Sequence, residues 1–126
     1  MPGLDELFRE LVEVWPKDSI WSVATPISGM LRFATESEPY PCWTVFHIDC
    51  EHEVQNASGC RIIEDELIRL GFMIQWCSRP GLNHRCNLIP GPKHYAVLPM
   101  LGDGSTRTEA LLRVAIQAFA GVRDLP

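Results

Sequence analysis

Cysteine and histidine are the residues of this chain that could do chemistry, and they are confined to one stretch. All five cysteines and all four histidines lie between Cys42 and His94. Two groups of them could supply zinc ligands, namely His47, Cys50 and His52, and Cys77, His84 and Cys86. A structural zinc site needs four thiolate or imidazole ligands, and neither group has the tight spacing of such sites, although Cys77 and Cys86 could be cross-strand neighbours. We therefore expect reduced core cysteines and no metal, with a zinc-stabilised domain as the alternative.

The same side chains could instead form a thiolate nucleophile and its imidazole base. The candidates are Cys50, Cys77 or Cys86 for the nucleophile and His47, His84 or His94 for the base. Such a pair needs hydrogen-bond contact and a lowered thiol pKa, and no recognised nucleophile motif surrounds these cysteines. Glycine-rich phosphate-binding motifs are absent as well. We predict a protein that is not an enzyme and has no cofactor; a cysteine-dependent enzyme is the alternative.

Charge is distributed unevenly along the chain. The net charge is −5, yet the segment from Leu67 to Gly102 contains no acidic residue. Arg79, Arg85 and Lys93 fall in this acid-free segment, which predicts a local surface that faces an anionic ligand. The acidic net charge excludes a general nucleic-acid coat protein.

Tryptophan is frequent, with four residues in a chain of 126. Trp43 and Trp76 fall in strand-like segments and are interpreted as core residues. Trp15 and Trp21 bracket a polar link, and exposed tryptophans often anchor interfaces. We predict that Trp21 lies on a surface that contacts a protein partner or a second copy of the chain.

The first half of the sequence contains one clear helix and three strand-like segments. Apolar residues recur at three- and four-residue spacing over residues 3–15, which is typical of an amphipathic helix, and Pro16 ends it. Residues 20–25, 30–35 and 43–50 are strand-like. Residues 51–58 are polar and are interpreted as a loop. In the third strand, the predicted core face carries Thr44, Phe46, Ile48 and Cys50.

The second half predicts a helix, three strands and a helix. Ser58 could cap the first helix, which carries Glu64, Asp65 and Glu66 on its outer side and ends at Gly71 in a left-handed C-cap. Strands are predicted at residues 72–77, 86–89 and 94–100, followed by a turn at residues 102–104. A capping box of Thr106 and Glu109 then opens a last helix that Gly121 closes.

These elements predict an α+β fold in a single domain over residues 1–126. Short connections favour antiparallel pairing, and each helix has one apolar stripe that must pack on another element. We expect a mainly antiparallel sheet of about five strands packed by three helices. No apolar run is long enough to cross a membrane, and the N-terminal residues lack the pattern of a secretory signal, so a cytoplasmic protein is expected.

One resemblance covers the second half of the chain. A helix that ends in Leu-Gly-Phe is followed by three strands and the closing helix Thr-Glu-Ala-Leu-Leu-Arg-Val-Ala-Ile-Gln-Ala-Phe. In these features residues 62–122, about half of the chain, resemble the phage ABA sandwich domain, a family of small and largely uncharacterised phage proteins. The resemblance implies a phage or prophage origin and no particular activity.

The same order of elements is similar to the double-stranded-RNA-binding domain. Residues 91–94 (Gly-Pro-Lys-His) resemble its minor-groove loop, and residues 102–110 resemble the turn that opens its last helix. The family's basic pair at that helix start is here Thr106 and Arg107, and the Gly-Pro segment precedes only one strand. The resemblance implies, as an alternative function, binding of double-stranded nucleic acid through Lys93, His94, Arg107 and Arg113.

We therefore predict a small, phage- or prophage-encoded, non-enzymatic protein that binds a host or phage macromolecule. An inhibitor of a host defence system is one form that this function could take. The partner is expected to be a protein, with a homodimer as a further expectation and no membrane association. The residues predicted to bind a ligand or partner are Arg79, Arg85, Lys93, His94, Arg107 and Trp21.

Overall fold

The structure is a computed structural model that describes residues 4–25, 30–35, 42–47, 53–78, 83–91 and 100–123; for residues 4, 30, 42–47, 53–58, 78 and 90 it describes the backbone alone. The elements in these ranges are α1 (Leu4–Val14), β1 (Ser22–Ala24), β2 (Met30–Thr35), β3 (Cys42–His47), α2 (Glu53–Arg69), β4 (Phe72–Ser78), β5 (His84–Pro90), β6 (Met100–Gly104) and α3 (Arg107–Arg123). The α+β class and the helix–strand–strand–strand–helix order of the second half are confirmed. None of these helices is long and apolar enough to span a bilayer.

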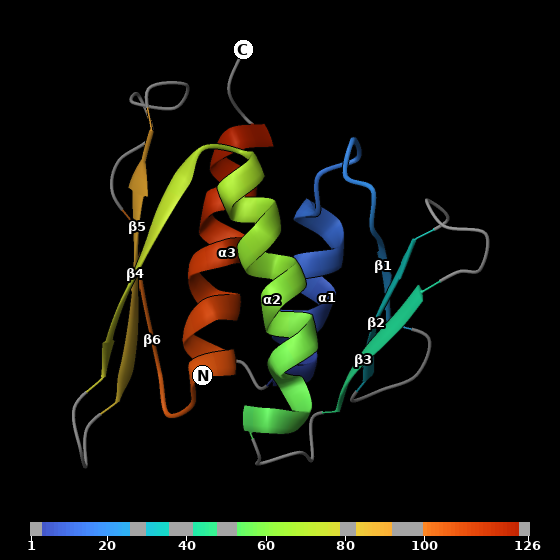
Figure 1. Cartoon of the computed structure of the whole chain (residues 1–126), viewed down its shortest axis with the longest axis horizontal. Coiled ribbons are helices and arrows are strands. Elements are labelled where there is room, and N and C mark those ends of the chain that lie inside the picture. The colour runs from blue at the N-terminus through green and yellow to red at the C-terminus, as the bar shows by residue number, and fades with distance from the viewer. Residues whose placement is uncertain are drawn as a thin grey trace.

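The strands form two antiparallel sheets with the helices between them (Figure 1). The sheet orders are β1-β2-β3 and β4-β5-β6, so the strands that the sequence predicted in one sheet are divided between two. The reason is the path of α2, which contacts β3 and β4 and carries the chain from one sheet to the other. Alternation along a strand shows which residues face a core, but it does not show which sheet the strand joins.

The hydrophobic core occupies both sides of the helical layer. From the first sheet, Leu31 and Phe33 of β2 face the helices, and Leu88 of β5 does so from the second sheet. The ring of Trp15, just after α1, lies 5.6 Å from that of Phe33 and 5.3 Å from that of Phe119 in α3. Trp15 therefore joins the end of α1 to the first sheet and to α3. The predicted core face of β3 lies outside the described side chains.

Helix α2 begins at Glu53, well before the predicted cap at Ser58, so the interpretation of residues 51–58 as a loop is wrong where the structure describes them. The prediction followed the apolar stripe, which is confined to the second part of the helix. Glutamate, glutamine and alanine are good helix formers. The first part of this helix is mostly polar, so it lacks the apolar periodicity from which a helix is predicted. The other end is as predicted, because Gly71 has φ of 100° and its N–H donates to the carbonyl of Ile68 at 2.9 Å.

The predicted turn at residues 102–104 is wrong, because these residues belong to strand β6. Gly102 and Gly104 are buried where α3 crosses this strand. A Cβ on Gly104 would come within 2.6 Å of the backbone nitrogen of Ala110. Glycine inside a strand often marks such a close approach of another backbone rather than a turn. Apart from Met100, the strand predicted at residues 94–100 lies outside the described residues.

At the start of α3 the predicted cap by Thr106 is confirmed, but Glu109 reaches back to Ser105 rather than to the Thr106 N–H. The hydroxyl of Thr106 accepts a hydrogen bond from the Glu109 N–H at 3.1 Å. The Glu109 carboxylate reaches back and accepts from the Ser105 N–H at 3.3 Å and from the Ser105 hydroxyl at 2.9 Å. The first of these contacts satisfies a donor that the first turn of a helix leaves unpaired, and the others tie the preceding residue to the helix. The helix continues past Gly121 to Arg123, so the predicted stop at Gly121 is wrong.

Candidate functional site

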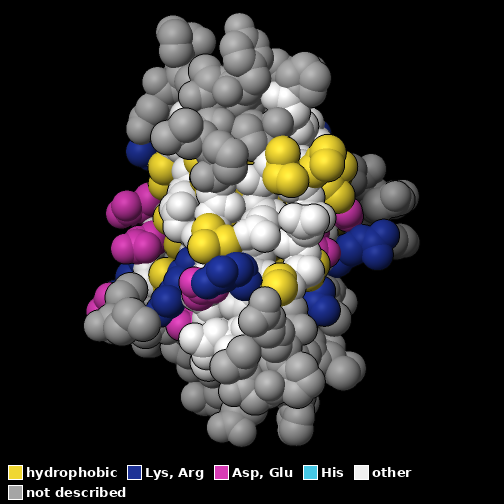
Figure 2. Space-filling view, turned by 90° about the vertical axis from the view of Figure 1, so that its left-hand side faces the viewer, with side chains coloured by type: hydrophobic (Ala, Val, Ile, Leu, Met, Phe, Trp, Pro, Cys, Tyr) yellow, Lys and Arg dark blue, Asp and Glu magenta, His cyan; other side chains and the backbone are white. Residues whose placement is uncertain are grey.

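The second sheet turns one set of side chains toward the helices and another toward solvent. The outward set, which we call the sheet face, consists of Met73, Gln75, Cys77, Arg85, Asn87, Ile89, Leu101 and Asp103. Antiparallel sheets usually carry polar side chains on a solvated face. Here Met73, Leu101 and Ile89 are 62%, 44% and 39% exposed. Figure 2 views this side and shows several hydrophobic side chains at the surface.

Arg85 is the one residue of the predicted basic surface that the structure describes, and it is neutralised by a neighbour. Its Nε lies 2.8 Å from a carboxylate oxygen of Asp103, its register partner on β6. The hydrogen bond from Arg85 to Asp103 raises the pKa of Arg85. Arg79, Lys93 and His94 lie outside the described residues. An acidic residue therefore lies beside the acid-free segment in the folded protein. Asp103 follows this segment directly in the sequence, and the pairing of β6 with β5 brings it opposite Arg85.

Arg107 and Arg113, predicted to contact phosphates in the nucleic-acid alternative, both contact protein groups. The Arg107 guanidinium lies over the Trp76 ring, 4.4 Å from its centroid. Arg113 pairs with Glu109 at 2.6 Å and donates to the carbonyl of Asp103 at 3.2 Å. Binding of nucleic acid draws most of its energy from cations that are available to phosphates. The arrangement at the start of α3 therefore does not favour that alternative.

The cysteines of the second sheet point to opposite faces. In the register, Cys86 is opposite Trp76 and Cys77 is opposite Arg85. Cys86 is buried and Cys77 is exposed, so the two cannot share a zinc ion as cross-strand neighbours, which the zinc alternative had considered. Within the part of the chain that the structure describes, no three potential metal ligands come together. Cys50 and His52 lie outside that part.

Thiol reactivity tests the alternative of a cysteine-dependent enzyme. Burial, together with the nearby Glu64 carboxylate, raises the pKa of Cys86 to about 12. We expect Cys86 to resist alkylation by iodoacetamide at pH 8 while exposed Cys77 reacts readily, because only the thiolate is nucleophilic. Peptide mapping of the native and urea-unfolded protein measures both rates. Faster labelling of Cys86 in the folded protein than in the unfolded protein would restore the enzyme alternative.

The predicted contact residue Trp21 lies beside a groove of about 690 Å³. We call this the Trp21 groove; its lining residues are Val12, Trp15, Pro16, Lys17, Ser19, Ile20, Trp21, Ser22, Val23, Arg32 and Ala34. Trp21 is half-buried, and Ile20 beside it is 67% exposed. The groove passes around the edge of β1, since Val23 is on the inner side of the first sheet while Arg32 and Ala34 are on the outer side.

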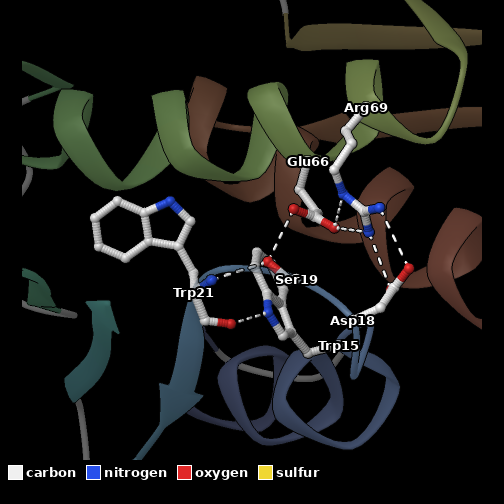
Figure 3. Close-up of polar contacts among 6 residues, drawn as sticks. All are labelled: Trp15, Asp18, Ser19, Trp21, Glu66 and Arg69. Atoms are coloured by element: carbon white, nitrogen blue, oxygen red, sulfur yellow. Dashed lines mark hydrogen bonds and ion pairs between the residues drawn. The ribbon is translucent and has the colours of Figure 1, made fainter. Parts of the chain in front are cut away.

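A polar network holds the chain that forms this groove (Figure 3). Glu66 of α2 is only 4% exposed and accepts hydrogen bonds from the Ser19 hydroxyl at 2.9 Å and from Arg69 Nε at 2.8 Å. The Ser19 hydroxyl also accepts from the Trp21 N–H at 3.1 Å, and Trp15 Nε1 donates to the Trp21 carbonyl at 2.9 Å. The segment between α1 and β1 is therefore tied both to α2 and to itself.

Asp18 completes the network and makes one end of it sensitive to pH. Hydrogen bonds and charge attraction from Arg69 hold the pKa of Asp18 below its ordinary value. A lowered folded-state pKa stabilises the protein above the ordinary pKa of aspartate, and this contribution is lost as pH falls through the lower folded value. We expect an NMR titration of the Asp18 carboxyl to show a lowered midpoint, and Arg69→Gln to raise it. An unchanged midpoint in that variant would contradict the pairing.

Sequence reasoning missed the polar anchor of the groove and the apolar residues of the sheet face. Glu66 was placed on the outer side of its helix with Glu64 and Asp65, whereas its carboxylate is buried. Its partner Ser19 is distant in the sequence, and no local pattern connects the two. For Met73, Ile89 and Leu101, the alternation of the strands was visible, but apolar residues on both faces hid which face would be covered.

No protein-family model matches the sequence, and comparisons with curated proteins and with solved structures found no match.

Proposed function

We propose that this chain is a non-enzymatic binding protein that docks a protein partner on the sheet face. The observation that supports it is the outward placement of Met73, Ile89 and Leu101, on a sheet whose other face packs on the helices. Exposed apolar side chains grouped on one surface mark interaction sites. Methionine is also enriched at protein interfaces, because its flexible side chain adapts to a partner.

Charge favours a protein partner over a nucleic acid. Among the described residues, the charged members of the sheet face are Arg85 and Asp103, and they pair with each other. A face with no net charge provides little electrostatic attraction for a phosphate backbone. It also has little charge to desolvate when an apolar partner surface packs on it. Two parts of this proposal rest on the sequence: the phage or prophage origin rests on the resemblance, and the inhibition of a host defence system rests on analogy of size and charge.

Partner capture by face variants tests the proposal. Met73→Asp and Leu101→Asp place a charge where the partner would pack, so we expect each to weaken capture from host lysate at least about tenfold. Ile68→Asp makes the same change at an exposed residue of α2 outside the sheet face, and we expect it to capture the partner like the unaltered chain. Circular dichroism of the three variants serves as the control for folding.

The outcomes separate the candidate partners. Capture that nuclease treatment abolishes would favour nucleic acid and overturn the proposal. Equal capture by the face variants and the Ile68 variant would also overturn it, because binding would then lie elsewhere. Sedimentation of the purified protein decides whether the partner is a second copy, since self-association that Met73→Asp prevents would identify a homodimer.

A further inference from the structure

The Trp21 groove combines apolar side chains with positive charge. Trp15, Trp21, Ile20, Val12 and Val23 supply apolar surface. Among the lining residues that the structure describes, none is acidic, although the chain carries 16 acidic residues. The described lining residues that carry a charge are Lys17 and Arg32, and Lys17 is exposed without an ion pair among the described residues. The described lining of the groove is therefore locally basic on an acidic protein.

The network of Figure 3 maintains this charge. Asp18 stands in the sequence between Lys17 and Ser19, which both line the groove, yet Asp18 does not. Arg69 binds its carboxylate through two hydrogen bonds, of 3.3 and 3.1 Å, on the side of α2. The nearest acid in the sequence is thus held away from the groove, where it would otherwise compete with a ligand for Lys17.

Hydrogen-bonding groups at the groove are also available to a ligand. The indole N–H of Trp21 makes no hydrogen bond among the described residues, and the ring points away from the polar network (Figure 3). Strand β1 is at the end of its sheet and pairs with β2 on one side, with no described strand on the other. Ser22 and Val23 of this strand line the groove. A free strand edge is a template for an extended peptide.

We propose that the Trp21 groove binds an extended, acidic peptide segment that carries bulky apolar side chains. Such a peptide would pair its backbone with the edge of β1 and place an apolar side chain against Trp15, Trp21 and Ile20. Its carboxylates would lie toward Lys17. This site is separate from the sheet face, so either proposal can fail without the other.

The strand edge favours a peptide over a small anion, because only a peptide uses the backbone groups of β1. The net charge of the protein works against the binding of an acidic peptide. At −5, the protein repels acidic ligands at long range and attracts basic ones. Binding of an acidic peptide therefore requires a local site, whereas non-specific attraction would favour a basic peptide.

Fluorescence anisotropy with labelled synthetic peptides tests the proposal on the full chain. The probe alternates Glu and Leu; one control peptide has Lys for each Glu, and another has Ser for each Leu. We expect the probe to bind with a dissociation constant on the order of 10 µM, and both control peptides to bind at least about tenfold more weakly. Indole-3-acetate, added as competitor, represents a small aromatic anion and is expected to displace the probe only weakly.

Matched variants locate the site. Lys17→Glu reverses a charge in the groove, and Arg61→Glu makes the same change in net charge at an exposed residue of α2. We expect about tenfold weaker binding for the first and an unchanged affinity for the second. Trp21→Phe keeps an aromatic ring but removes the indole donor, and we expect it to weaken binding several-fold.

Several results would overturn the proposal. One is that the probe does not bind the unaltered protein. Another is that the Lys or Ser peptide binds as tightly as the probe. A third is that the Lys17→Glu and Arg61→Glu variants bind the probe with the same affinity. Displacement by indole-3-acetate at the same concentration as by unlabelled peptide would assign the groove to small anions instead. None of these results depends on the sheet face, whose variant Met73→Asp is expected to bind the peptide like the unaltered chain.

Discussion

Replacing Gly102 with alanine is expected to destabilise the protein by about 3 kcal/mol and to lower its melting temperature by about 10 °C. The new Cβ would lie 2.4 Å from the carbonyl oxygen of Ala110 and 2.9 Å from both the backbone nitrogen and the Cβ of Val114. Two of these atoms are backbone atoms of α3, which cannot rotate away as a side chain could. Relief requires the helix to move off β6, and this loosens the core on that side. Thermal denaturation followed by circular dichroism measures the effect.

Gly121→Ala is the matched control. This residue lies within α3, where alanine is favoured over glycine by about 0.5–1 kcal/mol. We therefore expect the two glycine-to-alanine changes to have opposite signs. A Gly102→Ala protein as stable as the unaltered one would show that α3 and β6 do not approach this closely.

Replacing Glu66 with alanine is expected to lower the free energy of unfolding by about 2–3 kcal/mol. The change leaves the Ser19 hydroxyl and the Arg69 guanidinium without their buried acceptor. The side chain of Arg69 is 40% exposed, so water can replace part of the lost interaction, and the cost is below that of a fully buried pair. Urea denaturation measures the loss. Faster tryptic cleavage after Lys17 would report the release of the segment between α1 and β1.

Glu10→Ala provides the comparison, since Glu10 is an exposed glutamate of α1 and its loss should change stability by less than about 0.5 kcal/mol. Equal stability of the Glu66→Ala and Glu10→Ala variants would show that Glu66 does not anchor the segment that forms the groove. Glu66→Ala should also weaken the binding of the acidic peptide. Without Glu66, Arg69 would no longer be held where it binds Asp18, and Asp18 could then compete with the peptide for Lys17. A destabilised variant that keeps full peptide affinity would show that the anchor and the groove are independent.

Interactions between near neighbours in the chain were predictable from the sequence. The cap of α3 depends on Thr106 and Glu109, which are three residues apart, and the left-handed end of α2 depends on Gly71 alone. Strand β2 was predicted with its observed bounds, since its alternation places Leu31 and Phe33 on one face. Where the local signal was polar or ambiguous, as at Glu53 and at Gly102, the boundaries were wrong.

The candidate surfaces were predictable in residue type but not in arrangement. Trp21 was expected at a contact surface, and it lines a groove. Arg85 was expected to face a ligand, and it pairs with Asp103 instead, because β5 and β6 place the two residues opposite each other. Charge counted along the sequence does not show which charges meet across a sheet.

The sequence by itself determined the α+β class, the helices and most of the strands, because periodicity, caps and turns are set by residues a few positions apart. The tertiary structure alone decided that the strands divide into two sheets, that Met73, Ile89 and Leu101 face outward, and that Glu66 is buried. It also decided that Asp18 is held off the groove by Arg69. These features depend on contacts between distant segments, and such contacts exist only once the helices lie between the sheets.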